Sequence, residues 1–270
     1  MPEKTVLLTI ENNIAYVALN RADKHNAINM MMFYQLDKII KQLQKDKSLR
    51  AVIVHGKGVD FCSGLDVKSV MKAPVNIFKL LFKWLPGQSN LAQRVSTGWR
   101  KIPAPVIMAL HGRVWGGGLQ IALGGDFRFV EPSATLSILE ARWGLIPDMG
   151  GTLALKEHLP ADQAKLLAMT GQEISAQQAL EFKLITNICA DPLVSAKSLA
   201  DKLCQQSPDA VAGVKKLYNH VWWRSDRFTL ARETYYQLKV MLGKNQKIKT
   251  YNQTHSTSEA KVFKDRGDWS

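Results

Sequence analysis

Short strands rich in apolar residues, separated by helical stretches, most strongly limit how this sequence can fold. Residues 51–54, 105–110 and 127–130 form such compact segments. Strands buried on both faces appear as short apolar runs, whereas strands with one face in water alternate apolar and polar residues. A strand, a helix and a second strand in succession usually form a right-handed crossover with parallel pairing. The pattern therefore predicts an α/β protein built on a buried, largely parallel sheet.

The two ends of the chain differ in character. Residues 5–11 and 14–19 alternate apolar and polar positions around Asn12 and Asn13, which predicts a β-hairpin. Residues 30–44 carry apolar side chains at helical spacing. From Pro160 onward nearly everything reads as helix, over 161–169, 175–182, 192–206, 208–221 and 227–242. We predict an α/β core over residues 1–200 and a C-terminal helical subdomain over residues 201–270.

Composition indicates the cellular compartment in which we expect the protein to be found. With 270 residues it can bury a large core without disulfides or metals. The three cysteines (Cys62, Cys189 and Cys204) are widely spaced and form no CxxC pair, which fits a reducing compartment. No apolar run approaches the ~20 residues of a membrane span, and residues 1–10 do not resemble a targeting peptide. The expected location is cytoplasmic, with no membrane partner.

A basic segment in the first half of the chain predicts an anionic partner. The net charge is +13, yet residues 67–125 contain no acidic side chain. Eight positive residues lie there: Lys68, Lys72, Lys79, Lys83, Arg94, Arg100, Lys101 and Arg113. Nucleic acid, lipid headgroups or a phosphorylated small molecule would each complement this charge.

Three loops carry the residues typical of catalysis. The first contains Gly116, Gly117 and Gly118 between a predicted strand and a helix, where glycine allows a close approach to a ligand and leaves backbone N–H groups unpaired. The second spans residues 59–67 and also leads into a helix. The third spans residues 139–152 and places Glu140 and Asp148 in a segment rich in glycine and proline.

Together these loops resemble the crotonase superfamily, the enoyl-CoA hydratase/isomerase family, over residues 5–260. The similarity rests on Asn20-Arg21 with Asn26-Ala27, on the FCSGLD sequence at 61–66, on Gly112 with the glycine triplet, and on the segment from Glu140 to Thr152. The resemblance implies a repeated ββα spiral core, a C-terminal helical region for trimerisation, and acyl-CoA thioester substrates. It also implies a homotrimer or a dimer of trimers.

The resemblance assigns roles to particular residues. The backbone N–H groups of Leu65 and Gly117 match the family's oxyanion hole, where two donors stabilise the enolate oxygen. Residues matching the family's substrate-binding segments are Ser63, Gly64, Asp66, Val67, Lys68, Lys24 and Asn26. Coenzyme A belongs to the substrate, so neither a cofactor nor a metal is expected. Its phosphates offer an anionic partner for the basic segment.

The reaction depends on three side chains. Hydratases of the family use two glutamates; Glu140 matches one of them, while Gln120 stands where the other is expected. An amide cannot exchange a proton near neutral pH and would at most hold a water. Asp148 stands where dienoyl-CoA isomerases place an aspartate, although capping the following helix is an equal alternative. Isomerisation (Δ3-Δ2 or dienoyl) is therefore favoured over hydration.

Other functions remain open at this stage. The chain could be an enoyl-CoA hydratase of fatty-acid β-oxidation, a thioester hydrolase, or a non-catalytic homologue that binds RNA. Nucleic acid is disfavoured because interleaved arginine and aromatic patches are missing. Residues 77–85 combine phenylalanine, leucine, tryptophan and lysine as in a membrane-surface helix. In the resembled family this region covers the acyl chain, which is the favoured interpretation.

Overall fold

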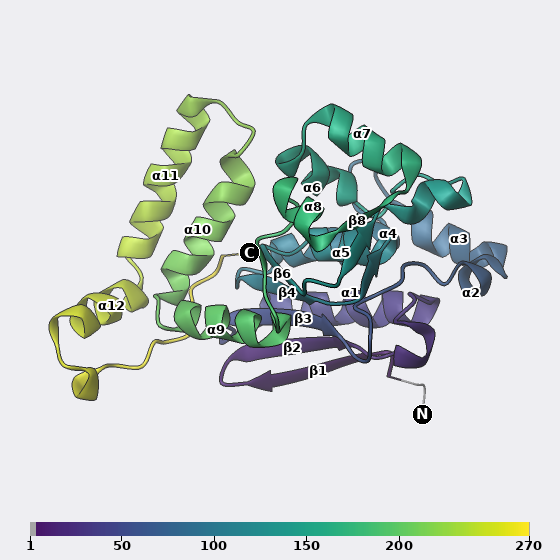
Figure 1. Cartoon of the computed structure of the whole chain (residues 1–270). Helices are drawn as coiled ribbons and strands as arrows, with labels where there is room; N and C mark the ends of the chain where they lie inside the picture. The colour runs from purple at the N-terminus through teal and green to yellow at the C-terminus, as the bar shows by residue number, and fades with distance from the viewer. Residues whose placement is uncertain (1–3, 270) are drawn as a thin grey trace.

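The computed structural model describes residues 4–269 and places two β-sheets among helices (Figure 1). Within that range the larger sheet has the strand order β1-β2-β3-β4-β6-β9. Its strands are β1 (Val6–Glu11), β2 (Ile14–Leu19), β3 (Ala51–Gly56), β4 (Val106–Leu110), β6 (Phe127–Val130) and β9 (Asn187–Ile188). The smaller sheet has the order β5-β7-β8, formed by β5 (Arg113–Trp115), β7 (Thr135–Ser137) and β8 (Glu173–Ser175).

Pairing in the larger sheet follows the sequence prediction. β1 and β2 form an antiparallel hairpin with Val6 opposite Leu19, and every later neighbour pair is parallel. The predicted α/β class and the parallel crossovers are therefore confirmed. Parallel strands end at the same edge of a sheet, so the loops after β3 and β4 begin close together.

Helices surround both sheets. They are α1 (Met30–Lys45), α2 (Val67–Met71), α3 (Pro74–Leu81), α4 (Leu91–Thr97), α5 (Gly117–Leu123), α6 (Gly151–His158), α7 (Ala161–Thr170), α8 (Ala176–Glu181), α9 (Pro192–Cys204), α10 (Pro208–Val221), α11 (Asp226–Met241) and α12 (Lys244–Thr254). Four 3₁₀ turns are also present among the described residues: η1 (Ala22–Lys24), η2 (Gly98–Lys101), η3 (Leu139–Trp143) and η4 (Thr257–Glu259).

Local chemistry explains where several helices begin. The Asn29 side chain accepts a hydrogen bond from Met32 N at 2.9 Å at the start of α1. Ser175 and Asp191 cap α8 and α9 in the same way, as their positions in the sequence predict. On α1, one face buries apolar side chains against the main core: Met32, Phe33, Leu36, Ile39, Ile40 and Leu43.

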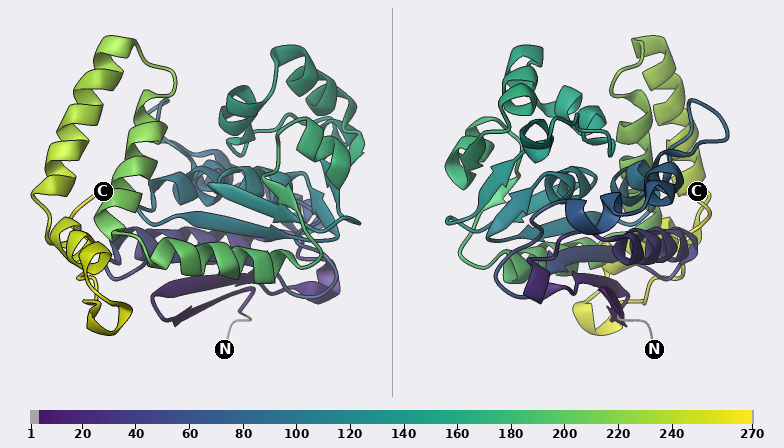
Figure 2. Two further views of the ribbon diagram at one scale, coloured as in Figure 1. Left: turned by 60° about the vertical axis from the view of Figure 1, so that its left-hand side comes forward. Right: turned by 90° about the vertical axis from the view of Figure 1, so that its right-hand side faces the viewer.

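The C-terminal helices fall into two groups. Helix α9 covers the outer face of the larger sheet, where Ala196 and Ala200 pack with Ile53 and Ile107. Helices α10 and α11 lie side by side and extend away from the sheets (Figure 2). They enclose a separate small apolar cluster of Ala212, Tyr236 and Trp269. Several other apolar side chains of these helices are exposed, including Val214, Leu230 and Leu238. Among the helices of residues 4–269, none has both the length and the apolar character that a bilayer span requires.

Candidate active site

A cavity of about 270 Å³ lies where the loops after β3 and β5 meet the segment that contains η3. The glycine-rich loops supply Ser63, Gly64, Leu65 and Val67 from one side, and Trp115, Gly116 and Gly117 from another. The third side consists of Leu139, Glu140, Trp143, Leu145, Ile146, Asp148 and Met149. All three loops that stand out in the sequence therefore line one cavity.

Backbone hydrogen bonds hold the first two loops together. Cys62 N donates to Arg113 O at 2.9 Å, and Trp115 N donates to Cys62 O at 3.0 Å. These bonds align the loop after β3 with strand β5. Glycine is required where the loops touch: a Cβ on Gly64, whose φ is +99°, would lie 3.0 Å from Trp115 O. The close approach brings Leu65 and Gly117 to the same cavity.

The two predicted oxyanion donors have free N–H groups. Among the described residues, neither the Leu65 N–H nor the Gly117 N–H donates to a protein acceptor. Gly117 is the first residue of α5, whose opening N–H groups have no partner within the helix. Gly116 precedes it with φ 50° and ψ −123°, a conformation essentially restricted to glycine. Two backbone donors are thus available at one cavity.

Glu140 is the acidic side chain most enclosed at this site. Gln120 Nε2 donates to Glu140 Oε1 at 2.6 Å, while Glu140 Oε2 is buried with no hydrogen-bond partner among the described residues. Burial raises the Glu140 pKa, and the nearby charge of Asp148 adds to this; the hydrogen bond from Gln120 opposes it. A carboxylate with a raised pKa and one unsatisfied oxygen is well suited to accept a proton.

Gln120 is fixed on both sides of its amide. Its Oε1 accepts hydrogen bonds from Met149 N at 2.9 Å and from Gly151 N at 3.1 Å, and the residue is buried. The amide therefore joins α5 to the loop before α6 and orients Glu140. It does not line the cavity. From the sequence, the amide could at most hold a water; in the structure both of its ends bind protein groups.

Asp148 lies on the cavity wall, and its carboxylate accepts a hydrogen bond from its own backbone N–H. Burial raises its pKa. The alternative that Asp148 caps the following helix is wrong, because Gly150 is the N-cap residue of α6 and no side chain caps that helix. A helix cap needs an oxygen within reach of the first-turn N–H groups, and here the chain passes through a left-handed Gly150 before α6 begins. Asp148 thus remains available to a ligand.

Four residues predicted to bind substrate lie outside the cavity wall. Asp66 caps α2 by accepting from Ser69 N and forms an ion pair with Arg21 at 2.7 Å. Lys24 in η1 and Lys68 in α2 are exposed. Asn26 is buried. These positions give no evidence of substrate contact, and the roles of the two lysines stay predictions.

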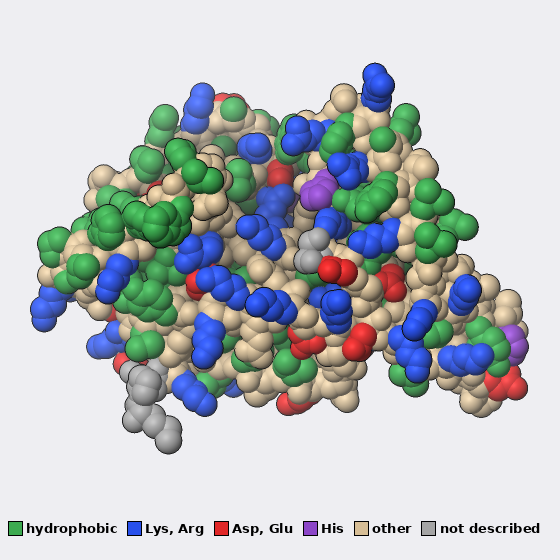
Figure 3. Space-filling model, turned by 180° about the vertical axis from the view of Figure 1, so that it is seen from behind, with side chains coloured by type: hydrophobic (Ala, Val, Ile, Leu, Met, Phe, Trp, Pro, Cys, Tyr) green, Lys and Arg blue, Asp and Glu red, His purple; other side chains and the backbone are tan. Residues whose placement is uncertain are grey.

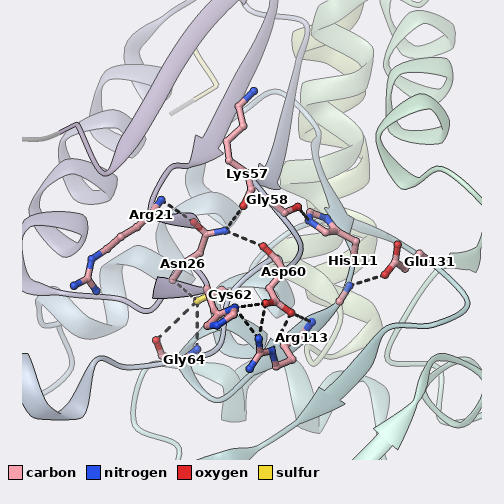
Figure 4. Close-up of polar contacts among 12 residues, drawn as sticks. Arg21, Asn26, Lys57, Gly58, Asp60, Cys62, Gly64, His111, Arg113 and Glu131 are labelled. Carbon is pink, nitrogen blue, oxygen red and sulfur yellow. Dashed lines mark hydrogen bonds and ion pairs between the residues drawn. The ribbon is translucent and has the colours of Figure 1, made fainter. Parts of the chain in front are cut away.

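The side chain of Asn26 belongs to a network that braces the loops (Figure 4). Its Nδ2 donates to Lys57 O and Asp60 O, and its Oδ1 accepts from Arg21 N. Asp60 also forms an ion pair with Arg113 at 2.9 Å. Asp60 therefore connects the loop after β3 to strand β5. Its pKa is lowered: hydrogen bonds from Arg113 outweigh the opposing effect of burial, which is the largest single contribution. Asn26 supports the site's shape, since its polar groups are used within the protein.

Sequence reasoning missed most of the apolar wall. Trp115, Leu139, Trp143, Leu145, Ile146 and Met149 line the cavity although only their neighbours were predicted to act. Ile146 is 75% exposed and Trp143 57% exposed, which is unusual for such side chains in a structured loop. Large apolar residues within a segment rich in glycine and proline were the available signal. They give the cavity an apolar side that suits a hydrocarbon chain.

Comparison with solved structures identifies the class of fold. An enoyl-CoA hydratase from Bacillus anthracis superposes with a TM-score of 0.85 at 24% identity, covering 97% of this chain and 99% of that one. At this identity the likeness establishes the crotonase fold, which confirms the predicted fold class.

The family follows from the sequence itself. The model of the enoyl-CoA hydratase/isomerase family matches residues 9–265, so the chain belongs to that family. A 1,2-epoxyphenylacetyl-CoA isomerase of Escherichia coli strain K12 is 31% identical over 217 residues, covering 79% of this chain and 81% of that protein. A carnitinyl-CoA dehydratase of the same strain is 31% identical over 216 residues, covering 78% of each. Overall similarity therefore does not separate isomerisation from addition or removal of water.

Proposed function

We propose that the protein isomerises enoyl-CoA thioesters by moving a proton from C2 to C4, with Glu140 as the only base. One observation carries this proposal: the position of the second hydratase carboxylate holds Gln120, whose amide is bound to Glu140 and to two backbone N–H groups. Hydration needs one group to activate water and another to deliver a proton, whereas a 1,3-proton shift needs a single base.

The cavity groups suit each step of this reaction. Glu140 Oε2, buried and without a partner among the described residues, accepts the C2 proton of a 3-enoyl thioester. Negative charge then moves onto the thioester oxygen, and the N–H groups of Leu65 and Gly117 stabilise it. Loss of one such donor typically costs ~10²–10³ in rate. Glu140 returns the proton to C4, which leaves the double bond between C2 and C3.

Asp148 supports a second candidate reaction, the isomerisation of a dienoyl-CoA. It lines the same cavity and has a pKa raised by burial, which outweighs the hydrogen bond from its own backbone N–H. In a conjugated diene the proton returns further along the chain than C4, so a second acid on the cavity wall could deliver it there. Both candidates use an acyl-CoA thioester, whose phosphates would be recognised by exposed lysines such as Lys24 and Lys68.

The decisive experiment offers the purified protein a 3-enoyl-CoA, a 3,5-dienoyl-CoA and a 2-enoyl-CoA and follows products by mass and ultraviolet absorbance. Rapid conversion of the first or second, with slow gain of water by the third, supports the proposal. Hydration of the 2-enoyl-CoA as the fastest reaction would refute it and identify a hydratase.

We also propose that the chain assembles as a trimer or a dimer of trimers. Support comes from apolar side chains left exposed on α10, on α11 and directly after them, including Tyr218, Trp222, Leu230, Leu238 and Leu242. Sedimentation equilibrium at micromolar concentration tests it, and a monomer would contradict it. RNA binding is the remaining alternative; filter binding at two salt concentrations, alongside calorimetry with acyl-CoA, separates the two.

A further inference from the structure

Helix α3 and the loop after it leave a cluster of large apolar side chains in water. Phe78, Leu81, Phe82, Trp84 and Leu85 form this cluster, which we call the α3 surface. Trp84 is 84% exposed, Phe78 63% and Leu85 60%. Only Leu80 of α3 is buried, so the helix is anchored by one side chain. Figure 3, which views the molecule from behind, shows hydrophobic side chains gathered at the left-hand edge, with basic side chains nearby.

The aromatic members of the α3 surface support one another. The ring centroids of Phe78 and Phe82 lie 5.3 Å apart, and Phe82 and Trp84 are also separated by 5.3 Å in an edge-to-face contact. Such pairs add to the ordering of the loop. The α3 surface is therefore an ordered apolar cluster outside the core.

Positively charged side chains lie beside the α3 surface, and no acidic side chain is close to it in the sequence. Lys79 and Lys83 line a cavity of about 370 Å³ together with Phe78, Phe82 and Trp84. Neither lysine takes part in an ion pair with the described residues. Residues 67–125 contain no aspartate or glutamate. The α3 surface therefore combines large apolar side chains with lysines that form no ion pair among the described residues.

The α3 surface does not form part of the candidate active site. The cavity that holds Glu140 is lined by residues from the segments 63–67, 115–117 and 139–149, and no residue of 77–85 is among them. The expectation that this segment covers the acyl chain finds no support in these contacts. A symmetric contact between two copies is also unfavourable, because it would bring Lys79 and Lys83 against like charges.

We propose that the α3 surface binds the headgroup region of an anionic phospholipid bilayer, which departs from the expectation that the protein has no membrane partner. Interfacial helices place phenylalanine, leucine and tryptophan at the acyl boundary and lysine among the headgroups, and the α3 surface has this composition. Tryptophan is the side chain most typical of membrane–water interfaces. Lysine is depleted at protein–protein interfaces, which favours lipid over a protein partner. The proposal does not depend on which reaction the protein catalyses.

The test uses the full chain and unilamellar vesicles of phosphatidylcholine, with or without one third phosphatidylglycerol, in co-sedimentation at low and at several hundred millimolar salt. We expect binding to the anionic vesicles only, weakened by salt. Each lysine near a charged surface contributes about fivefold to the partition constant, so Lys79→Gln/Lys83→Gln should weaken binding about 25-fold. The matched control is Lys244→Gln/Lys247→Gln, which removes the same charge from exposed positions in α12.

A second pair of variants tests the apolar part. Phe78→Ser/Trp84→Ser should weaken vesicle binding by tenfold or more, whereas Trp223→Ser, which removes another exposed tryptophan, should not. Phe78, Trp84 and Trp223 are all exposed, so we expect these variants to fold, and circular dichroism checks that they do. No binding to anionic vesicles at low salt would overturn the proposal, as would equal binding to neutral vesicles. Unchanged vesicle binding by Phe78→Ser/Trp84→Ser with a raised KM for acyl-CoA would overturn it in favour of an acyl-chain cover.

Discussion

Gln120→Glu is the substitution that best tests the proposed roles of Gln120 and Glu140 at this site. The change is nearly isosteric and retains an oxygen to accept from Met149 N and Gly151 N. Only the donor facing Glu140 is lost. The new oxygen would stand where Nε2 is now, 2.6 Å from Glu140 Oε1.

The size of the effect follows from that distance. Two unit charges 2.6 Å apart repel by about 6 kcal/mol at an effective dielectric constant of about 20. Two carboxylates at this separation cannot both be ionised at neutral pH, so the pair shares one proton. The pair then contains one acid and one base, which is what addition of water requires. Hydration should rise by up to ~10²-fold, the scale of a single general acid–base group.

Isomerisation should respond in the opposite direction. A carboxylate that shares a proton with its neighbour is a weaker base than Glu140 bound by an amide, so the 1,3-proton shift should slow by about tenfold or more at neutral pH. The rate should recover as the pH is raised and the shared proton is lost. The assay follows a 3-enoyl-CoA and a 2-enoyl-CoA between pH 6 and 9.5, and thermal melting confirms that the fold is retained.

A parallel change in the two activities would contradict these roles for Gln120 and Glu140. Unchanged isomerisation at neutral pH would mean that Gln120 does not set the basicity of Glu140. Hydration that is already fast in the natural protein and unaffected by Gln120→Glu would mean that a different pair of groups handles water. Asp148 would then be the first side chain to investigate.

Three further substitutions extend the test. Glu140→Gln should reduce turnover by at least ~10²-fold while acyl-CoA still binds in calorimetry, since the carboxylate moves the proton. Because burial raises the Glu140 pKa, the natural enzyme should lose activity as pH falls through that raised pKa. The cost of burying the charged carboxylate is complete above the raised pKa and absent below the ordinary carboxyl pKa, so the stability of this variant relative to the natural protein should increase as pH rises between them. Wild-type turnover in that variant would rule out Glu140 as the base. Asp148→Asn should impair a dienoyl substrate by ~10²-fold yet a 3-enoyl substrate by less than about tenfold; equal losses would assign it a general role. Gly118→Ala would place a Cβ 2.7 Å from Cys62 O, displacing the loop that carries Leu65, so kcat should fall ~10²-fold; normal kinetics would show that the loop tolerates the shift.

Short elements mark the limit of what the sequence reveals about this fold. Periodicity predicts α1, α10 and the β1–β2 hairpin, because each repeats its pattern often enough to be recognised. Strands β5, β7, β8 and β9 have two or three residues each and were not predicted. Helix α12 was missed as well, because its apolar positions are few. A strand of three residues exists only because a neighbouring strand supplies its hydrogen-bond partners.

The candidate site also has some features that the sequence predicts and others that only the structure shows. The sequence by itself determined the family, the glycine-rich loops and the presence of Glu140, because these depend on residue types at fixed local spacing. Only the tertiary structure decided that Gln120 binds Glu140 and the backbone of Met149 and Gly151, and that Asp148 is not a helix cap. Those contacts join positions 20 to 31 residues apart in the chain. Their geometry depends on how α5 packs against α6, and packing is a property of the whole core that no local pattern encodes.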